Sequence, residues 1–233
     1  MSDPGPASEH TRSLHEAAMA ELPFEDREDF EDARRGLIAT APSLVVRDEK
    51  GRAVWDMDSY AFVTSHDAAG SSGPSDGECP DEAPDTVHPS LWRMAQLNGM
   101  HGLFEVAPSI YQVRGYDLSN MTLVEGERGV IVIDPLISRE CAQAALALYR
   151  AHRGEREVSA VIYTHSHVDH FGGVKGVVSE EDVRSGGVPV WAPAGFLEYA
   201  VSENVLAGGA MMRRSAYMFA PGLPRGVRGQ VDA

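Results

Sequence analysis

The amino-acid sequence predicts an α/β fold, and three features of its second half carry that prediction. Four short segments alternate apolar and polar residues and are separated by turn-forming residues, as consecutive strands of a sheet are: residues 104–106, 110–114, 121–125 and 130–133. A segment with helical periodicity follows. After it comes a short, continuously apolar run, residues 158–163, of the kind found in buried strands. Strands on both sides of a helix are typical of α/β proteins.

The helix between these strands has a defined start, an apolar face and an end. Ser138 is placed to cap its first turn, and Gly154 is placed to end it. Its apolar residues recur at helical spacing: Cys141, Ala144, Ala145, Leu148 and Tyr149. Beyond residue 163 the sequence predicts a strand at residues 188–191 and a helix at residues 195–206.

The first part of the chain has a different character. Short amphipathic helices, broken by Pro23, are predicted between residues 10 and 38, and short strands at residues 43–48 and 53–63. Residues 64–84 contain almost no large apolar side chains. The sequence therefore predicts a helical and short-strand extension at 1–63, a flexible polar loop at 64–84, and the α/β domain at 85–233.

Composition excludes several kinds of partner. The 233 residues have a formal net charge of -15, which opposes binding to nucleic-acid phosphates and to anionic membrane surfaces. An anionic substrate would need local positive charge, from a metal ion or from arginines. The acidic, polar N-terminal segment lacks the features of a signal peptide, so a cytoplasmic location is expected. The two cysteines, Cys79 and Cys141, do not form a disulfide framework.

A cluster of metal-ligand residues follows the apolar run 158–163. His165 and His167 are two residues apart in an extended segment, so both imidazoles face one side and can share an ion. Asp169 and His170, in the following turn, offer an oxygen and a nitrogen to a second ion. A histidine-rich surface loop without metal is the alternative, but the end of an apolar strand is where a ligand loop belongs. Two neighbouring ions would favour hydrolysis.

The cluster and its flanking segments resemble a known family. Residues 164–173 match the His-x-His-x-Asp-His signature of the metallo-β-lactamase superfamily, and the flanking segments are similar to the linear alkyl sulfatases within it. The resemblance runs from about Phe30 to the C-terminus, with residues 64–84 fitting least. It implies a metallo-β-lactamase-like αββα sandwich, of which this chain supplies the N-terminal half. The segments that carry the resemblance are Pro89-Ser90-Leu91-Trp92-Arg93, Gly102-Leu103-Phe104-Glu105-Val106, residues 110–121, Val132-Ile133-Asp134-Pro135-Leu136, residues 203–208 and Met212-Arg213-Arg214.

The resemblance implies a zinc-dependent hydrolase that removes sulfate from alkyl sulfates through a metal-bridging hydroxide. By residue match, His165 and His167 hold the first zinc ion, Asp169 and His170 hold the second, and Asp169 is also the candidate catalytic residue. Asp134 matches the acidic position that supports the metal loop, with simple turn formation as the alternative. No residue is assigned to substrate binding. The family forms homodimers through a region that follows the part matched here.

The match is incomplete, and alternatives therefore stay open. A dinuclear site needs more ligands than this loop supplies, and no histidine follows His170. The carboxylates after it lie in a polar stretch or on the helix at 195–206, where we expect them to be solvated: Glu180, Glu181, Glu198 and Glu203. An inactive N-terminal portion of an alkyl sulfatase is thus one expectation. The others are a related hydrolase acting on a lactone, thioester or phosphodiester, and a non-catalytic chain that binds one metal weakly or assembles with a complementary polypeptide.

Overall fold

The computed structural model describes residues 5–64 and 83–232, which form two compact units. One unit comprises residues 1–35, 57–100 and 215–233, and the other comprises residues 36–56 and 101–214. The loop predicted at residues 64–84 lies almost entirely outside the described residues. In the described part of the chain, none of the helices is both long and apolar enough to cross a membrane.

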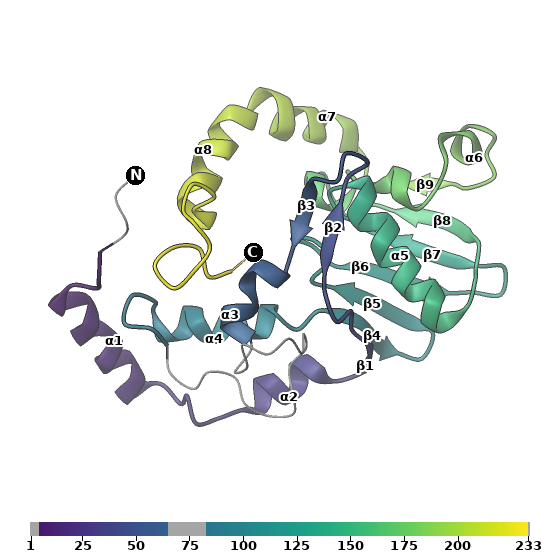
Figure 1. The fold of residues 1–233 in the computed structure, drawn as a ribbon. Coiled ribbons are helices and arrows are strands. Elements are labelled where there is room, and N and C mark those ends of the chain that lie inside the picture. Colours follow the sequence, from purple (N-terminus) through teal and green to yellow (C-terminus); the bar gives the residue numbers. More distant parts are fainter. Residues whose placement is uncertain (1–4, 65–82, 233) are drawn as a thin grey trace. The chain divides into compact units, whose positions relative to one another are not determined.

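The second unit is built on a mixed sheet, shown in Figure 1. Its seven strands are ordered β1-β4-β5-β6-β7-β8-β9; neighbours from β1 to β7 are antiparallel, and β7, β8 and β9 are parallel. A two-stranded antiparallel sheet pairs β2 with β3. The strand bounds are β1 Leu37–Ala39, β2 Val45–Arg47, β3 Ala53–Asp56, β4 Gly102–Ala107, β5 Ile110–Arg114, β6 Met121–Glu125, β7 Val130–Ile133, β8 Val158–Ile162 and β9 Val190–Trp191.

Helix α5, Arg139–Arg153, connects the parallel strands β7 and β8 and crosses the face of the sheet (Figure 1). Its start is as predicted, because the Ser138 hydroxyl accepts from the Cys141 backbone N–H at 3.1 Å. Tyr149, fully buried, packs against Tyr111 of β5 with ring centroids 5.9 Å apart. The α/β class and the succession of strands, helix and strand are therefore confirmed.

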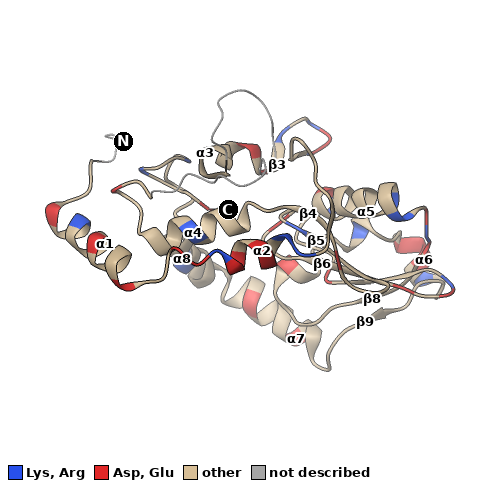
Figure 2. Cartoon of the chain, turned by 90° about the horizontal axis from the view of Figure 1, so that it is seen from below, with Lys and Arg blue, Asp and Glu red and all other residues tan. Residues whose placement is uncertain are grey.

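The remaining elements of this unit follow β8 and are mostly short. Charged residues, coloured red and blue in Figure 2, lie on α6 and on the connecting loops, whereas most of the sheet carries neither colour. The elements are the 3₁₀ turns Val168–His170 and Val174–Gly176, the helices α6 Glu180–Arg184 and α7 Phe196–Val201, the π-helical turn Ser202–Leu206, and α8 Gly208–Phe219, which continues beyond residue 214.

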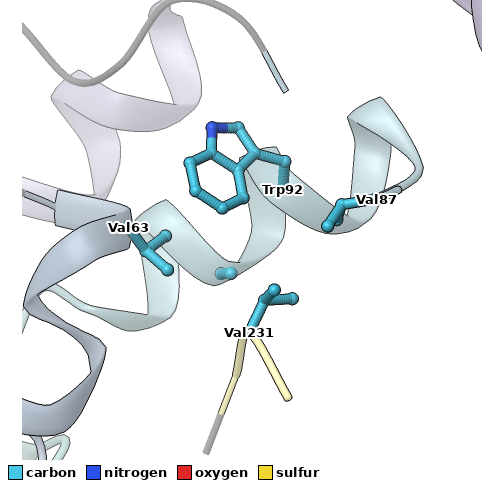
Figure 3. Close-up of a cluster of buried hydrophobic side chains, with 5 residues drawn as sticks. Val63, Val87, Trp92 and Val231 are labelled. Atoms are coloured by element: carbon cyan, nitrogen blue, oxygen red, sulfur yellow. The ribbon is translucent and has the colours of Figure 1, made fainter. Parts of the chain in front are cut away.

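The first unit is helical and packs around two small apolar clusters. One contains Phe30 and Met100, and the other contains Val63, Val87, Trp92, Ala95 and Val231 (Figure 3). Arg93 of α4 bonds to the Asp29 carboxylate of α2 at 2.8 and 2.6 Å and fixes the two helices together. The elements are α1 Glu9–Glu21, α2 Glu28–Arg34, the 3₁₀ turn Asp58–Tyr60, α3 Ala61–Thr64 and α4 Pro89–Asn98.

Two segments differ from the sequence-based expectation. The helical pattern predicted to residue 38 ends at Arg34, because Gly36 adopts a left-handed φ of 76° and its carbonyl accepts from Glu105 N–H. Leu37 and Ile38 therefore form β1. Residues 58–63, predicted as strand, are helical instead, because apolar residues three apart bury Tyr60 and Val63 on one side. Helix α4, with Pro89 in its first turn, was not predicted.

Candidate metal centre

The candidate ligands follow the C-terminal end of β8, in the loop that leads into the 3₁₀ turn Val168–His170. Asp134 follows the neighbouring parallel strand β7, and its backbone N–H donates to the Ile162 carbonyl at 3.0 Å. Because the carboxyl ends of parallel strands meet at one edge of a sheet, the chain brings Asp134 to the histidine loop. The loop itself is half-buried to exposed.

Asp134 is tied to the loop through both of its carboxylate oxygens. Oδ1 accepts from the Thr164 backbone N–H at 2.8 Å, and Oδ2 accepts from the Thr164 hydroxyl at 2.6 Å. Oδ2 also lies 2.9 Å from His170 Nδ1. The side chain is buried, and the residue adopts a left-handed φ of 55°, which an aspartate tolerates better than most residues. The buried Asp134 carboxylate therefore orients the histidine loop through these contacts.

These hydrogen bonds determine which imidazole nitrogen of His165 and of His170 carries the lone pair. A carboxylate only accepts, so His170 Nδ1 donates to Asp134, which leaves the lone pair of a neutral His170 on Nε2. The single hydroxyl proton of Thr164 goes to Asp134, so the contact of 2.8 Å between Thr164 Oγ1 and His165 Nδ1 needs His165 as donor. The lone pair of a neutral His165 is then on Nε2 as well.

Both of these nitrogens lie close to another candidate ligand atom. His165 Nε2 is 3.1 Å from His167 Nδ1, and His170 Nε2 is 3.2 Å from an Asp169 carboxylate oxygen. Two ligand atoms that share a tetrahedral zinc ion lie roughly 3.3 Å apart, so each pair has the spacing of two ligands on one ion. Asp134, His165 and His170 also offer ligand atoms within 4.8 Å of one another. We regard Asp134 as a support, because its oxygens are already engaged.

Two glycines allow the loop to approach the β7–α5 connection. A side-chain carbon at Gly173 would lie 2.2 Å from the Pro135 carbonyl oxygen, and one at Gly172 would lie 2.3 Å from the Ile137 carbonyl oxygen. Gly173 N–H also donates to the Leu136 carbonyl at 2.8 Å. The backbone therefore approaches closely at both glycines, and a larger residue would displace the loop.

Asp117 and Ser119, in the turn between β5 and β6, support the same region and were missed as site residues. Asp117 Oδ2 accepts from Ile137 N–H at 2.9 Å, and Oδ1 accepts from Leu118 N–H. Burial raises the pKa of Asp117 to about 6, against the lowering effect of these hydrogen bonds. The Ser119 hydroxyl donates to the Asp169 backbone carbonyl. Both residues lie in a segment that carried the family resemblance, which was the one signal available for them.

The four downstream carboxylates behave differently from one another. Glu180, Glu181 and Glu198 are exposed, as expected. Glu203 was expected to be solvated as well, and this was wrong: it is half-buried, with one carboxylate oxygen 3.6 Å from His167 Nε2. Its other oxygen accepts from the Ser166 hydroxyl at 3.3 Å. Spacing along the chain could not reveal this contact, because 36 positions separate Glu203 from His167.

Comparisons with known proteins show which proteins this chain is similar to. A linear primary-alkylsulfatase from Pseudomonas sp. is 51% identical over 228 residues, covering 98% of this chain and 32% of the relative. The alkyl/aryl-sulfatase BDS1 of Saccharomyces cerevisiae is 50% identical over 212 residues, covering 91% and 30%. The structure of the inverting sec-alkylsulfatase Pisa1 from Pseudomonas sp. matches with a TM-score of 0.86 and 49% identity, covering 99% of this chain and 34% of that one.

The chain thus spans about a third of the length of the relatives it matches. These identities of about 50% confirm the resemblance to alkyl sulfatases that was inferred from the sequence motifs. Residues 114–232, which include the histidine loop and its supports, match the metallo-beta-lactamase superfamily. Because this match covers half of the chain and contains the whole candidate centre, the chain belongs to the metallo-β-lactamase superfamily.

Proposed function

We propose that this chain carries the metal-binding loop of a zinc-dependent hydrolase that removes sulfate from alkyl sulfate esters. The observation that carries the proposal is the close approach of candidate ligand atoms, His165 Nε2 to His167 Nδ1 and His170 Nε2 to an Asp169 carboxylate oxygen. Where both atoms of such a pair present lone pairs, they repel one another unless a cation or a proton lies between them. Imidazole and carboxylate ligands at this spacing suit zinc. The substrate class is that of the similar proteins, which are alkyl sulfatases.

Each side chain has a role in this proposal. His165 and His167 hold one ion, and Asp169 and His170 hold the second. Asp134 keeps His165 and His170 in the tautomers that present Nε2, directly for His170 and through Thr164 for His165. When bound, the ions would supply an activated water as nucleophile and positive charge for the sulfate group. The remaining ligand positions would be filled by water, substrate or other protein groups.

The acidic composition supports the same proposal. With a formal net charge of -15, the chain as a whole repels an anionic ester, so local positive charge is needed to hold one. Two zinc ions within the loop would provide that charge. A cytoplasmic location stays a proposal.

Metal binding is tested first, on the 233-residue chain. Zinc content after exhaustive dialysis is measured by elemental analysis, with His167→Ala as the loss variant and His152→Ala, an exposed histidine of α5, as the matched control. We expect tightly held zinc in the wild type and in His152→Ala, and a loss in His167→Ala. Equal zinc in all three proteins, or none in the wild type, would overturn the proposed site.

Substrate class is tested separately, by sulfate release from dodecyl sulfate measured by ion chromatography. A lactone, a thioester and a phosphodiester are assayed in parallel. The proposal expects zinc-dependent release of sulfate that His167→Ala abolishes, with little turnover of the other esters. Zinc binding without sulfate release, or a preference for another ester, would leave the metal site in place and overturn the assignment of substrate.

A further inference from the structure

Glu203 lies in an unusual turn of the chain. Helix α7 ends at Val201, and the next five residues, Ser202–Leu206, form a π-helical turn closed by a hydrogen bond of 2.8 Å from Ala207 N–H to the Ser202 carbonyl. Single π-turns interrupt α-helical periodicity and are frequent at functional sites. The Asn204 side chain donates to the Ala200 carbonyl at 2.8 Å and braces the turn. Glu203 is therefore presented from a defined backbone.

An aromatic cluster holds α7 against the histidine loop. Phe196, in the first turn of α7, lies 5.3 Å from Tyr163 and 5.1 Å from Phe171, measured between ring centroids. Tyr163 follows β8, and Phe171 follows His170 directly. Tyr163 and Phe171 thus stand on either side of the loop in the sequence, and their ring centroids lie 5.8 Å apart. Packing of this kind fixes the position of α7, and so of Glu203, relative to the loop.

The two oxygens of Glu203 have different surroundings. Oε1 accepts from the hydroxyl of Ser166, the residue between His165 and His167. Oε2 is shielded from solvent, has no hydrogen-bond partner, and lies 3.6 Å from His167 Nε2. A buried carboxylate oxygen without a donor is unfavourable. A small movement of the imidazole would bring its Nε2–H within hydrogen-bond range and satisfy that oxygen.

We propose that Glu203 is a positioning residue for His167: it accepts the Nε2–H of the imidazole and so leaves the lone pair on Nδ1, directed at His165 Nε2. This inference rests on the metal site proposed above. Histidine ligands commonly donate their second ring N–H to a carboxylate, which fixes the tautomer and raises the basicity of the ligand. The tautomer of His165 is already fixed through Thr164. If Glu203 fixes that of His167, both histidines of this pair present a lone pair to a shared cation.

The contact contributes little to folding, which makes its role separable. The His167 side chain is 57% exposed and that of Glu203 is 36% exposed. An ion pair or hydrogen bond between two side chains that are each partly exposed adds little stability. Replacing Glu203 should therefore leave the urea unfolding midpoint unchanged, so that any effect on His167 is an effect on its orientation.

The test compares Glu203→Ala with Glu203→Gln and with Glu198→Ala, an exposed glutamate of the preceding helix. The first readout is the tautomer of neutral His167 in the zinc-free chain, from long-range ¹H–¹⁵N correlation spectra. We expect the Nε2–H form in the wild type, in Glu198→Ala and in Glu203→Gln, whose amide oxygen can still accept. In Glu203→Ala we expect a mixture of tautomers. The second readout is zinc affinity by competition with a chromophoric chelator, which Glu203→Ala should weaken about 10–100-fold.

The outcomes separate this inference from the proposed function. If the wild type binds zinc and Glu203→Ala shows wild-type affinity and an unchanged His167 tautomer, Glu203 has no positioning role and the metal site stands. If the wild type binds no zinc, the proposed function fails, and the tautomer spectra still decide whether Glu203 orients His167. Equal weakening by Glu198→Ala would also overturn the inference, because it would indicate a general effect of charge.

Discussion

The Asp134 carboxylate accepts both the backbone N–H and the hydroxyl proton of Thr164, at 2.8 and 2.6 Å. This double contact joins the ends of β7 and β8 at the point where the histidine loop begins. It also assigns the hydroxyl proton of Thr164, and through it the proton of His165 Nδ1. One buried carboxylate thus controls the backbone of the loop and the tautomer of a candidate ligand.

Replacing Asp134 with asparagine should weaken zinc binding without removing any candidate ligand. Asparagine keeps the size of the side chain and tolerates the left-handed backbone, but its amide nitrogen cannot accept from Thr164 or His170. We expect zinc affinity to fall about 10–100-fold. Competition with a chromophoric chelator measures this, with exposed Glu181→Gln as the control. Wild-type affinity in Asp134→Asn would show that the carboxylate does not orient the ligands.

Gly173→Ala should destabilise the loop for a purely steric reason. The added carbon would lie 2.2 Å from the Pro135 carbonyl oxygen and 2.5 Å from that of Ser138, both backbone atoms that cannot rotate away. Overpacking of this kind costs about 1–3 kcal/mol in the free energy of unfolding. Urea denaturation is the measurement. Gly187→Ala is the control, since its added carbon meets its nearest neighbour at 3.3 Å. A change equally small in both variants would contradict this account.

The buried carboxyl of Asp117 predicts a specific pH dependence of stability. Burial raises its pKa from 3.8 to about 6 in the folded chain. The folded state therefore binds the proton more tightly than the unfolded state. The contribution of Asp117 to the free energy of unfolding is largest below pH 4 and is lost as the pH rises through about 6, by up to about 3 kcal/mol.

The measurement is urea unfolding from pH 4 to pH 8 in the wild type and in Asp117→Asn, which cannot titrate. The difference between the two isolates Asp117 from the other groups that titrate in this range. We expect the wild type to lose stability relative to the variant as the pH rises. A constant difference across the range would mean that the pKa of Asp117 is not raised by folding.

Ser138→Ala should weaken the start of α5. The Ser138 hydroxyl accepts from Cys141 N–H, and loss of such a cap costs about 1 kcal/mol in the free energy of unfolding. Ser179 caps the five-residue α6 in the same way, through Asp182 N–H at 3.0 Å. Ser179→Ala should cost less, because α6 buries none of its residues. Thermal or urea unfolding of the two variants tests the order, and a larger loss in Ser179→Ala would contradict it.

The sequence determined the elements whose signals are local. Strands β5, β6 and β7 have the predicted limits, because alternation and turn residues mark both ends of each. The cap at Ser138 is equally local. The ligand loop was located by its position after an apolar strand. Where the sequence was misread, at Leu37 and at Tyr60, short apolar segments fitted both periodicities and packing with distant residues made the choice.

Only the tertiary structure decided which side chains surround the ligand loop. Asp117, Ser119, Asp134 and Glu203 approach it from three other segments of the chain, at separations that no local pattern encodes. Sheet pairing brings Asp134 to Thr164, and aromatic packing of Phe196 brings Glu203 to His167. The ligand types are thus a property of the sequence, whereas their tautomers and orientation depend on hydrogen bonds between segments that meet only in the folded chain.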